Sequence, residues 1–411
     1  MDGVGKSSAR GWAITLVGIL AAVAIAINMF KVPPTMSLLM ADFGIGPALG
    51  GWLMTVPTVT GLILALPSGG LTDRFGPKKI GLFAVFSAAV GSIIGTFSPN
   101  IELLLVSRFV EGLSFALIGV AVPAIISIWF EPEKNGAPMA IWSAWVPIGM
   151  LAIFTGANFF VDVDSPHTWT NVWWLSTVLL VVFGVLYLLF VRAPEGYEAE
   201  EAPKVSLVKG MKSPASWLLA VVFAMFAFIM YAISTFAPTY CQQELGFSLA
   251  DSNLFSSLIS VGMILGAVLM SPVLNKVAKL KGRLWLLVVS MVLTALIAIL
   301  AFNVPPSATV LVMLVTGVVL QLVPAVVWPI APSAAVAPMY IGTTFGVIAL
   351  GRSIGGFGNA SIGTLIETSG WGAAIILLVG IGVVGLIACL TLFKFLKEPA
   401  GSGESANRES M

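Results

Sequence analysis

The hydrophobic positions of this chain fall into long runs that short polar segments separate. A helix that crosses a bilayer needs about 20 consecutive, mainly apolar residues, and these runs are close to that length. The pattern therefore predicts an all-α membrane protein with twelve transmembrane helices. We place these spans at Trp12–Leu39, Gly50–Leu66, Ile80–Phe97, Ile101–Phe130, Ala137–Phe160, Trp173–Val191, Trp217–Phe236, Asn253–Leu274, Leu284–Phe302, Ser307–Ala331, Gly342–Ile366 and Trp371–Phe393.

One long polar segment, which contains the sequence EGYEAEEAPK, divides the spans into six and six. Short motifs recur in both halves at nearly one offset: residues 122–124 and 323–325 read Val-Pro-Ala, and residues 137–139 and 337–339 read Ala-Pro-Met. These repeats indicate two pseudo-symmetric six-helix bundles, a plan typical of transporters. The predicted division is an N-terminal bundle at 1–191, a cytoplasmic central loop at 192–216, a C-terminal bundle at 217–397 and a disordered cytoplasmic tail at 398–411.

The distribution of basic residues predicts the orientation. All of the 20 Lys and Arg except Lys31, Arg108 and Arg352 fall in the terminal segments or in loops predicted at one end of the bundle. The loops predicted at the other end carry acidic residues instead. Basic loops remain in the cytoplasm, so both termini are expected to be cytoplasmic.

Composition excludes several classes of protein. Hydrophobic residues make up 58% of the chain and charged residues 9%, whereas a soluble domain has about 25% charged residues. No basic tract with interleaved aromatic residues indicates nucleic-acid binding. The sequence contains no paired carboxylates, metal-ligand cluster or Ser/His arrangement that would indicate an enzyme, and no cofactor is expected.

Four charged residues lie well inside the predicted spans: Lys31, Arg108, Glu111 and Arg352; Glu102, at the end of its span, can reach water. A charge at mid-bilayer costs at least about 2.5–3.5 kcal/mol on insertion scales, so each of them needs a partner or a wet cavity. Three cations face one carboxylate, and this surplus of positive charge favours a cavity that receives an anion.

Each of these residues has a structural alternative. Arg352, deep in its span, is predicted to contact substrate, or else to bind nearby carbonyl groups. Lys31 either faces the cavity beside Asn28 or extends to the outer surface. Arg108 and Glu111 lie three residues apart on one helix face, so they form a structural pair, or else Glu111 binds the coupling proton and releases Arg108 to an anion.

Neutral residues complete the predicted substrate site. They are polar or aromatic side chains inside the fifth, tenth and eleventh spans: Trp145, Gln321, Trp328 and Asn359. Glycines four residues apart, such as Gly262 with Gly266 and Gly351 with Gly355, predict close helix packing, with a gating hinge as the alternative.

The turn between the second and third spans reads GGLTDRFGPKK, residues 69–79. The pattern Gly-x-Leu-x-Asp-Arg-x-Gly-x-Lys at this place resembles the signature loop of the major facilitator superfamily of secondary transporters. The resemblance implies that Gly69, Asp73, Arg74, Gly76 and Lys78 act in conformational gating. Pro77 stands where the family usually has a basic residue.

Three further segments are similar to the cyanate and nitroimidazole porter branch of that family. They are Asn28-Met29 with the base and prolines that follow, the sequence LGGWLMTVP at residues 49–57, and the WF-x-P-x-K-x-G turn at residues 129–136.

The predicted function is secondary transport of a small organic or inorganic anion by alternating access, proton-coupled or by exchange. The protein is expected to be a monomer in the cytoplasmic membrane of a prokaryote, with the bilayer, the solute and protons as its partners. Efflux of neutral or lipophilic compounds is the alternative within transport, and a non-transporting membrane sensor is the alternative of another class.

Overall fold

The computed structural model describes residues 9–131, 134, 136–194, 207–277 and 279–396. The predicted tail at 398–411, and residues 195–206 of the predicted central loop, lie outside this part of the chain. The described first half contains α1 (Ala9–Met29), η1 (Pro33–Thr35), α2 (Met36–Phe43), α3 (Pro47–Leu64), α4 (Pro67–Phe75), α5 (Pro77–Thr96), α6 (Ile101–Trp129), α7 (Gly136–Ser143), α8 (Trp145–Gly156), η2 (Ala157–Phe159) and α9 (Trp169–Phe190). The second half contains α10 (Leu207–Gly210), α11 (Pro214–Gln243), α12 (Leu249–Lys276), α13 (Leu280–Ala301), η3 (Pro306–Ala308), α14 (Thr309–Ile330), η4 (Ala331–Ala334), η5 (Pro338–Tyr340), α15 (Ile341–Gly355) and α16 (Gly358–Phe395).

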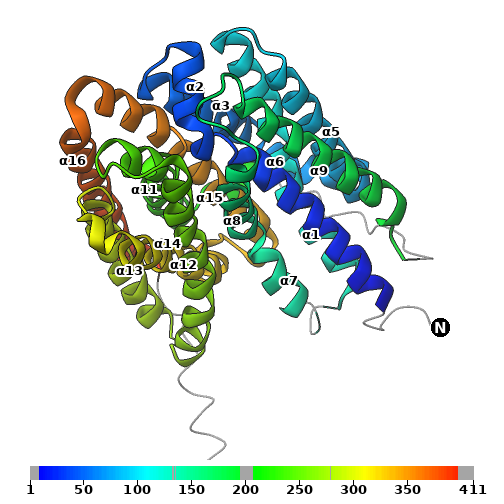
Figure 1. Ribbon diagram of the computed structural model, residues 1–411. Helices are drawn as coiled ribbons and strands as arrows, with labels where there is room; N and C mark the ends of the chain where they lie inside the picture. The colour runs from blue at the N-terminus through cyan, green and yellow to red at the C-terminus, as the bar shows by residue number, and fades with distance from the viewer. Residues whose placement is uncertain (1–8, 132–133, 135, 195–206, 278, 397–411) are drawn as a thin grey trace, which may run out of the picture.

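Helices α1, α5, α6 and α9 lie together on one side of the molecule, and α11, α13, α14 and α16 lie on the other (Figure 1). The described residues contain eleven helical stretches that are long and apolar enough to cross a membrane. The last of them, Pro338–Phe395, is 58 residues long and includes both the eleventh and the twelfth predicted spans. Gly370, with φ 78° and ψ 178°, separates the two within α16. The predicted all-α membrane architecture is therefore confirmed.

Three spans predicted as continuous are broken: the first, the fifth (at Ala144, between α7 and α8) and the eleventh. The first ends its α-helix at Met29 and resumes at Met36, because Pro33 and Pro34 cannot donate the backbone hydrogen bonds that would continue the helix. Lys31 lies in this break, and the Thr35 hydroxyl donates to its carbonyl over 2.8 Å. The eleventh span is interrupted between α15 and α16 at residues 356–357.

A threonine from the first half hydrogen-bonds to the backbone at the break in the eleventh span. The Thr55 hydroxyl of α3 donates to the Gly356 carbonyl at 3.1 Å and accepts the Ala360 amide at 3.0 Å. Backbone groups freed by a break inside a membrane need such partners, because no water is available in the hydrocarbon region. The irregular backbone of one half therefore depends on a side chain of the other.

The glycines spaced four apart serve close packing. Gly262 of α12 lies against the backbone of α14, where an added methyl group would collide with the Leu314 carbonyl. Gly351 of α15 lies in the same way against the Ala220 carbonyl of α11. This is the packing role of small residues at helix contacts in membranes.

Polar contacts between the two halves gather at the end of the bundle that carries the acidic loops, which we call the acidic end. A carboxylate oxygen of Glu367 accepts the Ala48 amide at 2.9 Å, in the first turn of α3. Asn253 of α12 donates to the Asn158 side chain at 2.8 Å and to the Pro34 carbonyl at 3.0 Å. At this end the halves are therefore closed against each other.

Replacing Glu367 by Gln tests the closure at the acidic end. The substitution removes the negative charge at the N-terminus of α3, an interaction worth about 0.3–1 kcal/mol at an exposed position. Spin labels at the exposed residues Ser165 and Gln243 should then report an open population about two- to fivefold larger. The matched control is Thr368→Val, which removes a hydroxyl bonded within its own helix. Equal distance distributions in Glu367→Gln and the unsubstituted protein would contradict this role.

Candidate functional site

A buried ion network lies inside the first half. The Lys31 ammonium group donates to Glu111 at 2.8 Å, to the Asn28 side chain at 2.7 Å and to the Ser92 hydroxyl at 2.9 Å. It also lies 4.3 Å from the ring centre of Trp173. Lys31 is fully buried. It therefore does not extend to the surface, and its three donors are satisfied within the protein.

Arg108 joins the network from α6. Its guanidinium forms an ion pair with Glu111. It also donates to the carbonyls of Leu53 at 2.9 Å, Asn28 at 3.1 Å and Met29 at 2.8 Å. Asn28 and Met29 are the last residues of α1, where helical carbonyls lack intrahelical partners and the helix dipole is negative. Arg108 therefore caps the broken first span.

The pairing of Arg108 with Glu111 agrees with the structural interpretation of their spacing. Lys31 reaches the same carboxylate from the break in the first span, and the network holds two cations against one anion. Three of the predicted substrate-binding residues, Asn28, Lys31 and Arg108, contact one another or this carboxylate. They do not line the hollow that lies between the two halves of the protein. Their predicted contact with substrate remains a prediction.

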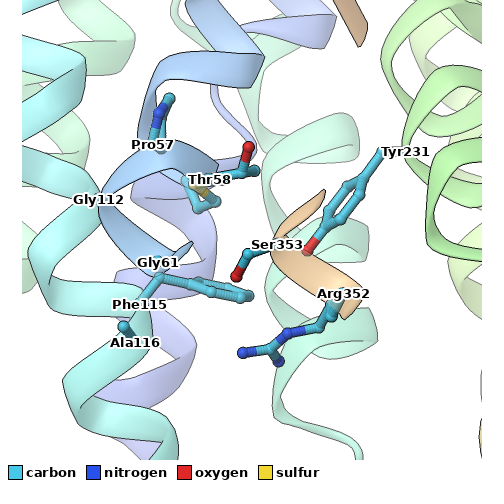
Figure 2. Close-up of a pocket in the computed structure, with 10 residues that line it drawn as sticks. Pro57, Thr58, Gly61, Gly112, Phe115, Ala116, Tyr231, Arg352 and Ser353 are labelled. Carbon is cyan, nitrogen blue, oxygen red and sulfur yellow. The ribbon is translucent and has the colours of Figure 1, made fainter. Parts of the chain in front are cut away.

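A hollow between the halves is lined by the remaining cation of the predicted spans, Arg352, which is partly exposed. The hollow encloses about 280 Å³ of empty space, part of it open to solvent. Its first-half lining comes from the end of α1, from α3 and from α6: Met29, Pro57, Thr58, Gly61, Gly112, Phe115 and Ala116. Its second-half lining comes from α11 and α15: Tyr231, Arg352 and Ser353. Figure 2 shows the polar ends of these three side chains turned toward the side where Phe115 lies.

Arg352 forms no ion pair or hydrogen bond with any residue that the structure describes. The centre of its guanidinium lies 5.5 Å from the Phe115 ring centre, a cation–π distance. Phe115 in turn packs on Trp145, with ring centres 4.9 Å apart, and Trp145 stacks on Trp142 at 5.1 Å. Trp145 therefore supports the wall of the hollow from behind.

The other predicted site residues do not line this hollow. Trp328 of α14 is 38% exposed and contacts the rings of Phe223 and Phe345. Gln321 of the same helix lies close to Gly266 of α12. For these two residues, a substrate role remains a prediction.

Asn359 is buried at the break in the eleventh span. It accepts the Thr235 hydroxyl at 2.7 Å and donates to the Gly356 carbonyl at 3.0 Å. Both contacts are within the second half, so the structure gives Asn359 a position beside the broken backbone.

The sequence did not identify four residues that line the hollow: Tyr231, Ser353, Thr58 and Phe115. Ser353 follows Arg352 directly, and Tyr231 is a polar aromatic residue near the middle of its span. These signals are too weak to select them, because many spans carry serine or an aromatic residue. Their common position depends on how two helices from each half meet.

The signature turn joins α4 to α5. Gly76, with φ 83°, ends α4 in a conformation that favours glycine, and α5 begins at Pro77. Asp73 is exposed and forms no ion pair or hydrogen bond with the described residues, while Arg74 lies 5.2 Å from the Phe75 ring centre. The gating role of Gly69, Asp73, Arg74, Gly76 and Lys78 remains a prediction.

Comparison with known proteins identifies the family. Residues 18–359 match the Major Facilitator Superfamily, and the chain belongs to it. A Bacillus subtilis protein named as a niacin/nicotinamide transporter, NiaP, is 24% identical over 86% of this chain and 88% of its own. Multidrug resistance protein 1 of the same organism is 22% identical over 74% of this chain and 77% of its own. The uncharacterized MFS-type transporter YfiU, also from Bacillus subtilis, is 26% identical over 64% of this chain but 55% of its own length.

The fold has a counterpart among solved structures. A bacterial homolog of the human lysosomal transporter Spinster, in an inward-facing and unoccupied conformation, matches with a TM-score of 0.72. The match covers 96% of this chain and 100% of that chain at 16% identity. The major-facilitator fold predicted from the sequence is confirmed, and the protein is a membrane transporter rather than an enzyme.

The ion network predicts how substitutions at Glu111 and Lys31 combine. Glu111→Gln leaves two buried cations without a counter-charge and should destabilise the protein by about 3–5 kcal/mol. Lys31→Met in the same chain removes one of those cations, so the double variant should be more stable than Glu111→Gln alone. Thermal unfolding of the four proteins in detergent measures this coupling. Additive effects of the two substitutions would show that the charges do not interact.

Proposed function

We propose that this transporter moves a small organic or inorganic anion across the cytoplasmic membrane by alternating access. The observation that carries the proposal is Arg352, a guanidinium without a protein counter-charge among the described residues, which lines a hollow between the two halves. A cation at membrane depth needs a partner or a wet cavity. An anionic solute supplies that partner at the place where both halves can reach it.

The closed contact at the acidic end supports a rocking mechanism. Solute enters or leaves from the opposite end in the state described here, and the other state requires separation of Glu367 from α3. The signature turn lies at the opposite end of the bundle, which carries the basic loops and which we call the basic end. There it would regulate the reverse movement. The positive-inside distribution assigns the basic end to the cytoplasm.

Proton coupling is proposed at Glu111. Its two cationic partners, Lys31 and Arg108, approach from different segments of the first half. Protonation of this carboxylate would leave both cations without a counter-charge, and Arg108 also holds the end of α1. A proton at Glu111 would therefore loosen the broken first span, whose last helical residue, Met29, lines the hollow.

Efflux of neutral or lipophilic compounds is the second candidate. The first-half wall of the hollow is mostly apolar, and one relative is named for multidrug resistance. This function would leave Arg352 unpaired beside a neutral solute, which is unfavourable in a buried site. We therefore rank it below anion transport, and we propose that the working unit is a monomer with one solute pathway.

The anion proposal predicts the behaviour of Arg352→Gln. Purified protein should be stabilised by one or more members of a panel of monocarboxylates, dicarboxylates, cyanate, nitrate and sulfonates. A ligand present at about 100 times its dissociation constant adds about 2.7 kcal/mol to the free energy of unfolding. Arg352→Gln should weaken this binding by about ten- to hundredfold, because a charge-assisted hydrogen bond is lost. Arg283→Gln is the matched control, since Arg283 donates to the Val277 carbonyl and does not line the hollow. Stabilisation by lipophilic compounds alone, unchanged in Arg352→Gln, would favour efflux instead.

Proton coupling makes a separate prediction. In proteoliposomes with an internal pH dye, a gradient of the identified solute should drive proton movement through the unsubstituted protein. The Lys31→Met/Glu111→Gln variant, which keeps the buried charge from increasing, should retain solute flux but lose this proton movement. Proton movement that persists in this variant would place the coupling group elsewhere.

A further inference from the structure

The two walls of the hollow differ in chemistry. Arg352, Tyr231 and Ser353 all come from the second half and carry hydrogen-bond donors. The first half contributes apolar side chains and glycines, apart from Thr58. The Thr58 hydroxyl already donates to the Thr55 carbonyl at 2.7 Å. A solute in this space therefore meets donors on one side and an apolar surface on the other.

The donors of the second-half wall are unused within the described protein. Only 4% of the surface of Tyr231 is exposed, and its hydroxyl, which lies at the hollow, forms no hydrogen bond with a described residue. The Ser353 hydroxyl and the Arg352 guanidinium likewise have no partner there. Three donors without a protein partner beside one hollow together offer a binding place for a ligand group that accepts several hydrogen bonds. A carboxylate has this acceptor capacity and the charge that complements Arg352.

The charge available to the hollow is a single cation. Lys31 and Arg108 lie in the ion network of the first half and donate to Glu111 and to backbone carbonyls. A second negative group on the solute would face Phe115, Ala116 and the glycines of α3 and α6, where no donor is free. Burying an unpaired charge there is unfavourable. The hollow therefore suits a monoanion.

The apolar wall carries one aromatic side chain, Phe115, on which a flat apolar group can stack. Phe115 presents its ring to the hollow, and Gly61 faces Ser353 of the other half, where an added methyl group would lie 3.2 Å from the serine hydroxyl. Gly61 thus keeps space beside the donors.

We infer that the solute is a small monocarboxylate with a flat apolar body, whose carboxylate binds Arg352, Tyr231 and Ser353 while its body lies on Phe115. This inference rests on the proposed anion transport and adds the class of anion and two specificity-determining residues, Tyr231 and Ser353. A dicarboxylate lacks a second partner, and an inorganic anion leaves the apolar wall uncovered. A neutral isostere leaves Arg352 unpaired.

Binding of four probes to the full-length protein tests the inference. Calorimetry in detergent should rank benzoate above nitrate and terephthalate by at least about tenfold, and above benzamide by about a hundredfold. Tyr231→Phe, which removes one oxygen atom, should weaken benzoate binding by about ten- to hundredfold, and Ser353→Ala should act in the same direction. Tyr187→Phe is the matched control, because the Tyr187 hydroxyl is also buried but donates to the Pro77 carbonyl, away from the hollow.

The outcomes separate the inference from the function on which it rests. If nitrate or terephthalate binds as tightly as benzoate through Arg352, or if Tyr231→Phe leaves benzoate binding unchanged, the monocarboxylate assignment is wrong while anion transport stands. If no anion of the wider panel binds and Arg352→Gln changes nothing, both proposals fail. Weaker binding in Tyr231→Phe with an unchanged unfolding temperature supports the assignment, since a purely structural tyrosine would alter stability rather than selectivity.

Discussion

The ion network around Glu111 is the interaction on which the rest of the first half depends. One carboxylate holds Lys31 from the break in the first span and Arg108 from α6. Arg108 in turn occupies the carbonyls at the end of α1. Without these contacts, a helix end and two cations would be buried unsatisfied in the membrane, at a cost of several kcal/mol for each ion. The network therefore permits an irregular first span close to the solute pathway.

This arrangement divides the buried charges between the halves. The first half pairs its cations internally, whereas the second half leaves Arg352 facing the hollow. A charge that is partnered within one rigid body does not change its surroundings when the bodies rock. Arg352 is different, because its opposite wall, including Phe115, belongs to the other half. The proposed rocking of the halves would therefore alter the environment of Arg352 more than that of Lys31 or Arg108, which agrees with the proposed role of Arg352 in solute binding.

The sequence was sufficient for the architecture and for part of the site. Hydropathy predicted the spans because a helix that crosses a bilayer must satisfy its backbone internally and be apolar along its length. The spacing of Arg108 and Glu111 correctly indicated a pair. The third member, Lys31, is 80 residues away from Glu111 and was unpredictable from spacing. The helix breaks in the first, fifth and eleventh spans were missed: Pro33 and Pro34 cause the first, and partners on other helices satisfy the freed backbone in the first and the eleventh. Tyr231 was missed because its relation to Arg352 exists only once α11 and α15 pack.

The break between α15 and α16 connects the hollow with the closed acidic end. Arg352 and Ser353 lie in the last turn of α15, directly before the break that Thr55 spans. Beyond the break, α16 continues to Glu367, which caps α3. Thr55 and Ala48 both belong to α3, and their partners lie in α16 or in the break directly before it. Separation of the halves at the acidic end therefore acts on α3 and α16 at both contacts. Opening must either carry Thr55 away from two buried backbone groups, which then need new partners, or bend α16 at its glycine-rich start. Because the proposed solute-binding residues are adjacent to this joint, a change in their position on binding would reach the acidic-end contact through covalent structure rather than through a chain of side chains.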